Sequence, residues 1–189
     1  MNKTKRKIFE TSMKLFAEKG YDATSIEEIT SVVGVAKGTL YYHFSSKEEI
    51  FNFLIDEGMK LLQNSINIKI SQKNNSIDQL KSIILIQIKV LYKYQDFITI
   101  ILSQIWGNEP RNIICKKYVV QYLQIIEKII QAGINKGEII NADPETIASE
   151  IFSTTCICLI YKIKRNNKIN VNDLYRELEN ILFNGLCKK

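Results

Sequence analysis

The sequence predicts an all-α protein of about nine helices. Apolar residues recur along most of the chain at the spacing of one helix face. Residues typical of helix starts and stops bracket these segments. The 189 residues include only 8 Gly and 2 Pro, too few for the many turns of a sheet protein. With 46% hydrophobic and 24% charged residues, the chain has the composition of a soluble globular protein of one or two domains.

The first three predicted helices are separated by glycines and short loops. Residues 4–19 carry an apolar stripe, and Gly20 follows as a helix stop. A capping box at Thr24–Glu27 opens a second, shorter helix, which Gly34 ends. The third helix is expected over residues 37–44. The amino-terminal part of the chain is therefore a cluster of three helices.

Six further helices are expected at about residues 45–70, 76–92, 95–106, 110–132, 143–162 and 172–184. Capping boxes at Ser45–Glu48 and Ser76–Gln79 start two of them. Asp143 as N-cap, followed by a first-turn proline and an acid, starts another. Gly133 is expected just beyond the end of its preceding helix. We expect two domains, residues 1–60 and residues 61–189.

The net charge of +6 raises the question of a polyanionic partner. Residues 1–60 carry nine Lys and Arg against nine Asp and Glu, so this part of the chain is neutral overall. The whole excess lies in residues 61–189, where a general bias toward Lys explains it as well as a binding surface does. Net charge therefore assigns no partner, and any nucleic-acid contact must depend on where individual cations lie.

The residue inventory gives no support for an enzyme. His43 is the single histidine, and the four cysteines have neither metal-ligand nor redox spacing, so we expect no metal and no cofactor. They are interpreted as small apolar side chains in a reducing cytosol. The charged amino end is not a signal peptide, and the apolar stretches Ile83–Leu91 and Ile151–Tyr161 are too short or too interrupted to span a bilayer. We therefore expect a cytoplasmic protein with no membrane partner.

Two short helices joined by a glycine turn, at about residues 25–44, form a candidate helix-turn-helix. Leu40 and Phe44 share one face of the second helix and can pack onto the first. The opposite face carries polar side chains that could enter a major groove. Gly38 leaves room for DNA near the backbone. Lys47 places a cation at the start of the next helix, where exposed amides suit a phosphate.

Residues 8–54, and above all GVAKGTLYYHFSSKEEIF (Gly34–Phe51), resemble the DNA-binding domain of the TetR family of bacterial transcriptional regulators. The glycines, the tandem tyrosines, His-Phe and the Ser-Lys-Glu-Glu helix start all coincide. The resemblance implies a homodimer that binds a palindromic operator, usually as a repressor released by a small-molecule effector. It also implies that these DNA-binding residues approach bases or grip the backbone: Ser25, Lys37, Gly38, Thr39, Tyr41, Tyr42, His43 and Lys47.

Three residues depart from the family pattern, and they concern the operator sequence more than DNA binding itself. Thr30 and Val33 stand where alanines are common. Ala36 stands where Ser or Thr is common, and its lack of a capping side chain costs about 1 kcal/mol. The basic arm at residues 3–7 either reaches DNA or is a frayed, solvated end, and the sequence does not choose.

Beyond about residue 60 the sequence holds no motif that fixes a ligand. The resemblance implies a C-terminal helical domain for ligand binding and dimerisation, with a hydrophobic or amphipathic effector. Candidate pocket residues are Phe97, Ile101, Trp106, Tyr118 and Tyr122, although ordinary core packing explains each of them too. Candidate dimer-interface residues are Ile151, Thr155, Cys158, Leu178 and Leu182. An alternative function is a helical small-molecule carrier or protein-interaction module without an operator.

Overall fold

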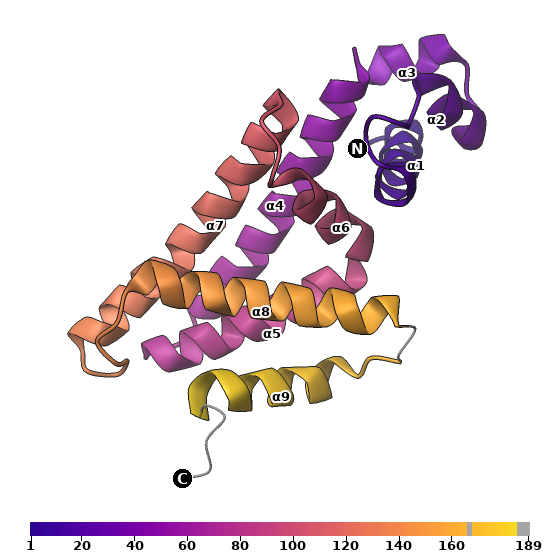
Figure 1. The fold of residues 1–189 in the computed structure, drawn as a ribbon. Helices are drawn as coiled ribbons and strands as arrows, with labels where there is room; N and C mark the ends of the chain where they lie inside the picture. Colours follow the sequence, from indigo (N-terminus) through magenta and orange to yellow (C-terminus); the bar gives the residue numbers. More distant parts are fainter. Residues whose placement is uncertain (166–167, 185–189) are drawn as a thin grey trace. The chain divides into compact units, whose positions relative to one another are not determined.

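The computed structural model describes residues 1–165 and 168–184, and within them the chain forms nine α-helices and no strand (Figure 1). The helices are α1 (Lys3–Lys19), α2 (Ile26–Val33), α3 (Lys37–His43), α4 (Lys47–Ile70), α5 (Ser76–Lys93), α6 (Gln95–Gln104), α7 (Pro110–Asn135), α8 (Pro144–Lys164) and α9 (Val171–Asn184). The all-α prediction is confirmed. Cys187 lies outside the described residues.

The chain divides into two compact units. The first comprises residues 1–60 and 96–117, and the second comprises residues 61–95 and 118–189. The expected boundary after Lys60 coincides with one edge of the first unit. Residues 96–117, expected in the second domain, belong with the first unit instead. This assignment depends on contacts between residues far apart in the sequence, which helical periodicity cannot reveal.

In the first unit, α2 and α3 form the expected helix-turn-helix. The Ser25 hydroxyl caps α2 by accepting a hydrogen bond from the Glu28 N–H (3.0 Å). Gly34 ends α2 with φ 77°, a left-handed conformation that costs glycine little because it has no Cβ. Leu40 and Phe44 are buried, so α3 turns its apolar side inward and its polar side outward.

The helix starts lie one residue away from the predicted capping boxes. The observed caps pair Ser25 with Glu28, Ser46 with Glu49 and Asn75 with Asp78. The Glu49 carboxylate also accepts hydrogen bonds from the N–H and hydroxyl of Ser45 (both 2.6 Å), and these bonds lower its pKa. Polar residues stand in tandem at each start, so two registers satisfy the same sequence signature.

In the second unit, α5 packs against both α8 and α9. Helix α7 runs through Gly133 to Asn135, so the predicted stop at this glycine is wrong. A Cβ atom on Gly133 would lie 2.5 Å from Ile139 Cδ1 and 2.9 Å from Ser76 Cβ. Gly133 therefore allows the segment after α7 and the start of α5 to approach the helix, and the chain turns later, at Gly137 (φ 71°).

Helix α8 lies close to its predicted bounds, but it is long and apolar as a whole, whereas the sequence analysis considered only the stretch Ile151–Tyr161. Its 21 residues, with a mean hydropathy of 1.3 over the most apolar window, make it the one helix among the described residues that could cross a membrane by length and composition. A single helix of this kind is weak evidence for a membrane span. Within the second unit α8 packs against α5 and buries Ala148, Cys156 and Leu159.

Candidate functional site

The outward side of α3 presents the polar side chains expected to meet DNA. Tyr42 is 84% exposed and Tyr41 is 45% exposed, although both are large aromatic residues. A Cβ atom on Gly38 would meet no atom within 4 Å, so the space beside this backbone is open. Thr39 and His43 are half-buried, and the His43 ring lies edge-on to the Tyr42 ring. Together with exposed Lys37, these residues form one accessible surface on a helix whose other side is buried.

Lys37 is not a free cation, because its ammonium pairs with the carboxylate of Glu27 on α2. The hydrogen bond between the two groups raises the pKa of Lys37 and lowers the pKa of Glu27. Both side chains are more than half exposed, so the pair contributes little to folding. A phosphate or base edge would have to compete with Glu27 for this ammonium.

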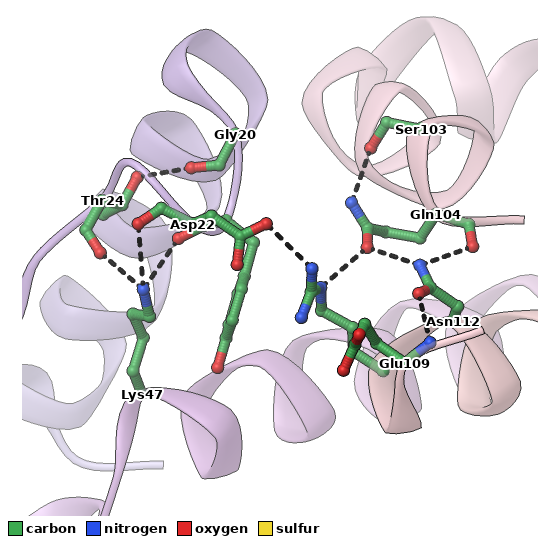
Figure 2. Close-up of polar contacts among 10 residues, drawn as sticks. Gly20, Asp22, Thr24, Lys47, Ser103, Gln104, Glu109 and Asn112 are labelled. Carbon is green, nitrogen blue, oxygen red and sulfur yellow. Dashed lines mark hydrogen bonds and ion pairs between the residues drawn. The ribbon is translucent and has the colours of Figure 1, made fainter. Parts of the chain in front are cut away.

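Lys47 has a different environment from the other seven candidates. Its Nζ donates hydrogen bonds to the carbonyl oxygens of Tyr21 (2.9 Å) and Thr24 (2.8 Å), and it lies 3.5 Å from the Asp22 carbonyl oxygen (Figure 2). The same atom lies 4.3 Å from the centroid of the Tyr21 ring. The ammonium is directed to the α1–α2 turn, a use that the sequence did not reveal. Its contact with a phosphate stays a prediction.

The basic residues near the amino end do not form an extended arm. Helix α1 already begins at Lys3, with Asn2 as its N-cap. The Lys5 ammonium lies over the rings of Phe44 (4.7 Å) and Phe53 (4.6 Å), and Arg6 pairs with Glu10 along the same helix. These cations therefore occupy fixed positions on the first unit, rather than a frayed end.

The five candidate pocket residues are divided between the two units. Phe97 and Ile101 are buried in the first, whereas Trp106 is 85% exposed there. Tyr118 is half-buried in the second unit. Tyr122 is fully buried there, and its hydroxyl donates to Gln87 Oε1 (2.7 Å).

The second unit has a shallow apolar pocket of about 260 Å³ between α5, the segment after α7, α8 and α9. Its lining includes Ile77, Ile139 and Ile147, together with the carboxylates of Glu138 and Glu150. None of the five candidate pocket residues lines it. Ligand pockets usually measure about 300–1,000 Å³, so this one is too small to enclose a large amphipathic molecule.

The structure changes the interpretation of α8 and α9. Ile151, Thr155 and Leu178, predicted for a dimer interface, are buried within the second unit and belong to its core. Cys158 and Leu182 are half-buried. The exposed large apolar residues of these two helices are Ile157 (58%), Tyr161 (60%) and Ile181 (43%). Because α8 is apolar on more than one side, its sequence did not distinguish the inward from the outward stripe.

Asp22 and Arg111 are two charged residues that the sequence analysis missed. Arg111, near the start of α7, donates from Nη2 to Asp22 Oδ2 over 2.8 Å, although the two residues stand 89 positions apart (Figure 2). No motif surrounds either residue, so nothing in the sequence pairs them. Among the described residues, no group of three or more His, Cys, Asp or Glu could hold a metal ion.

Residues 8–53 match the family model described as "Bacterial regulatory proteins, tetR family". Along nearly its full length the chain is similar to a solved structure from Clostridium perfringens, a putative fatty acid metabolism regulator. The two are 33% identical, the match covers 97% of this chain and 100% of that one, and the TM-score is 0.91. The chain belongs to the TetR family.

Two other relatives of this TetR-family chain have more specific descriptions. The biofilm operon negative regulator IcaR of Staphylococcus aureus (strain Newman) is 40% identical over 76 residues, which are 40% of this chain and 41% of IcaR. The transcriptional regulator FadR of Bacillus subtilis, solved in complex with stearoyl-CoA, is 24% identical with a TM-score of 0.82; the match covers 96% of this chain and 99% of that one. The chain spans less than half the length of the curated relatives that it matches.

The TetR-family match has a direct bearing on the candidate site. Its residues 8–53 include all eight predicted DNA-binding residues, from Ser25 to Lys47. They also include Tyr21 and Asp22, but they do not include Arg111. The contact between Asp22 and Arg111 therefore joins the matched segment to a part of the chain outside it.

Proposed function

We propose that this TetR-family regulator is a repressor that binds a palindromic operator as a homodimer and is released by a hydrophobic or amphipathic effector. The observation that carries the proposal is the exposed polar side of α3, where Tyr42 projects beside an unobstructed Gly38. A recognition helix must present such residues while its other side is fixed to a support. Buried Leu40 and Phe44 supply that attachment.

The proposed division of labour follows from where each side chain lies. Lys37, Gly38, Thr39 and Tyr41 lie along α3, and we assign them to base edges or the nearest phosphates. Ser25 at the start of α2, with Tyr42 and His43 at the end of α3, is assigned to the backbone. The IcaR relative is described as a negative regulator, which supports repression.

Homodimer formation is proposed through the exposed apolar side of α8 and α9. Ile157 and Tyr161 stand four residues apart on α8 and so share one side of the helix, and Ile181 on α9 is also exposed. A two-fold dimer would cover this surface and would match the two halves of a palindrome. A regulator that binds chromosomal DNA would work in the cytoplasm, which is the localisation that we propose.

For the effector we propose a fatty-acyl compound such as an acyl-CoA thioester. The C. perfringens relative is described as a putative fatty acid metabolism regulator, and the B. subtilis relative was solved with stearoyl-CoA. The five candidate lining residues, Phe97, Ile101, Trp106, Tyr118 and Tyr122, stay predictions. Stearoyl-CoA should dissociate the operator complex, whereas free coenzyme A should not. If neither stearoyl-CoA nor other acyl-CoA thioesters dissociate the complex, the effector class is wrong.

The decisive experiment is selection of operator sequences from random DNA with the full chain. We expect enrichment of a palindrome, and Tyr42→Ala should weaken its binding by about tenfold through loss of a backbone contact. Tyr92→Ala, at an exposed tyrosine on α5, is the matched control and should bind as wild type does. Enrichment of no sequence by wild-type protein would overturn the proposed function and favour the carrier or interaction module.

A further inference from the structure

The turn between α1 and α2 is held by side chains from two distant parts of the first unit. On one side, the Lys47 ammonium contacts three carbonyl groups of the turn, those of Tyr21, Asp22 and Thr24, at 2.8–3.5 Å. An ammonium has three N–H donors, so this geometry can use all of them. Thr24 closes the turn from within, because its hydroxyl donates to the Gly20 carbonyl oxygen (2.8 Å).

Arg111 contacts the same turn from residues 96–117 of the first unit. Its Nη2 donates to Asp22 Oδ2 (2.8 Å), and its guanidinium carbon lies 4.9 Å from the centroid of the Tyr21 ring. The Arg111 side chain is only 20% exposed, whereas that of Asp22 is 77% exposed. The Arg111 side chain is thus mostly removed from solvent, whereas the carboxylate that it pairs with is not.

A network of hydrogen bonds fixes the position of Arg111. Arg111 Nε donates to Gln104 Oε1 (3.1 Å), and Asn112 Nδ2 donates to the same oxygen (2.8 Å) and to the Gln104 carbonyl oxygen (2.8 Å). Asn112 Oδ1 accepts from the Glu109 N–H (2.9 Å), which caps the start of α7 (Figure 2). These hydrogen bonds therefore fix the guanidinium in a position from which it can pair with Asp22.

We propose that Arg111 is a positioning residue for operator binding, which acts together with Lys47 by fixing the Tyr21–Asp22 turn and hence the start of α2. This inference rests on the proposed DNA-binding function. Ser25, the cap of α2, follows directly after Thr24, whose carbonyl Lys47 holds. Loss of either cation should therefore displace the start of α2, and Arg111 need not touch DNA to have this effect.

The dependence of operator affinity on salt separates positioning from direct contact. A cation that neutralises a phosphate adds about one unit to the slope of log affinity against log salt. A positioning residue lowers affinity without changing that slope. We expect Arg111→Ala to weaken operator binding by about tenfold with the wild-type slope, the size expected for loss of a charge-assisted hydrogen bond. Lys47→Ala should also weaken binding, and its slope should fall by about one unit if Lys47 makes the predicted phosphate contact as well. Lys69→Ala, which removes the same charge from the exposed end of α4, should bind normally.

Exchanging the charges of Asp22 and Arg111 should restore operator affinity. A general loss of protein stability would not be reversed by this exchange. Asp22→Arg and Arg111→Asp should each weaken operator binding, and the double variant should regain most of the wild-type affinity. Thermal unfolding of every variant should show a folded protein at the assay temperature. The proposal is wrong if Arg111→Ala binds like wild type, if its salt slope falls by about one unit, or if the double variant shows no recovery.

Hydrogen exchange tests the positioning step without DNA. In the free full-length protein, Arg111→Ala and Lys47→Ala should speed amide exchange in residues 20–26, whereas Lys69→Ala should not. Unchanged exchange in both variants would overturn the positioning role even if wild-type protein binds an operator. Faster exchange together with no operator for wild-type protein would instead overturn the proposed function and, with it, the relevance of Arg111 to DNA.

Discussion

Glu27 holds the ammonium of Lys37 in an ion pair that joins α2 to α3. Lys37 is the cation at the start of the proposed recognition helix, so a carboxylate lies where a phosphate is expected to approach. The free protein thus keeps its recognition-helix cation partly neutralised, and DNA must replace Glu27 to use it.

Glu27→Gln should tighten operator binding by about threefold, because it removes one negative charge near the phosphates and releases Lys37. Fluorescence anisotropy with labelled operator would measure the change. Glu18→Gln, which removes an exposed carboxylate from α1, is the control and should have a smaller effect. Weaker binding by Glu27→Gln would show that the ion pair orients Lys37 for DNA.

Since the pKa of Glu27 is lowered, the Glu27–Lys37 pair persists at neutral pH. Its small stabilising effect on the fold is lost only as pH falls through that lowered pKa.

Ala36→Ser should stabilise the first unit by about 1 kcal/mol. Ala36 is the N-cap of α3, and no side chain caps this helix in the structure. A serine hydroxyl there could accept a hydrogen bond from an unsatisfied N–H of the first turn. Urea unfolding would measure the gain. A loss of stability would mean that the serine side chain cannot adopt the capping rotamer.

Tyr122→Phe should destabilise the second unit by about 1–3 kcal/mol, although the substitution removes a single oxygen atom. The Tyr122 hydroxyl donates to Gln87 Oε1, while Gln87 Nε2 donates to the Phe152 carbonyl oxygen (3.2 Å) and Cys156 Sγ (3.3 Å). Without the tyrosine, a buried amide oxygen loses its donor. Tyr92→Phe at an exposed position is the control, and equal stability of both variants would contradict the prediction.

Gly133→Ala should also destabilise the second unit, by about 1–3 kcal/mol, because the new methyl group would overlap Ile139 and Ser76. Helix propensity alone would favour alanine by about 1 kcal/mol. Gly38→Ala offers the opposite case, since its Cβ would meet nothing and the variant should gain stability. Thermal unfolding of the pair would test both signs. A gain in stability for Gly133→Ala would mean that Ile139 moves aside without cost.

Cys115 and Cys156 should resist alkylation at neutral pH in the folded protein. Burial raises the pKa of each thiol to about 12, so almost no thiolate forms. Half-buried Cys158 should react faster, and mass spectrometry of labelled peptides would rank the three. The raised pKa values also predict that Cys115 and Cys156 contribute to the free energy of unfolding below about pH 9. This contribution should fall as pH rises toward 12. Rapid labelling of Cys156 would indicate that α8 opens from α5.

The helices and the helix-turn-helix could be predicted from the sequence, because both depend on neighbouring residues. Caps, glycines and apolar spacing act within a few positions, and they placed α3 and its exposed side correctly. The same local signals placed the N-caps one residue away from their observed positions. Two adjacent polar residues stand at each helix start, and either of them fits the capping pattern.

Contacts between distant residues could not be predicted in this way. Nothing near Lys47 indicates that its ammonium turns back to the α1–α2 turn, and nothing near Arg111 indicates Asp22. The two sides of α8 present a related problem, because Ile151 and Ile157 are equally apolar in the sequence but only the first is buried. Such choices depend on the tertiary packing of each unit.

The grouping of residues 96–117 with the helix-turn-helix bears on how such regulators can be recombined. A chimaera that takes only residues 1–60 from this protein would contain α3 but not Arg111. The Tyr21–Asp22 turn would then contact the residue of the recipient protein at that position. A graft that carries 1–60 together with 96–117 would keep the pair intact. A graft meant to keep the Asp22–Arg111 pair must therefore combine two separate segments of the chain.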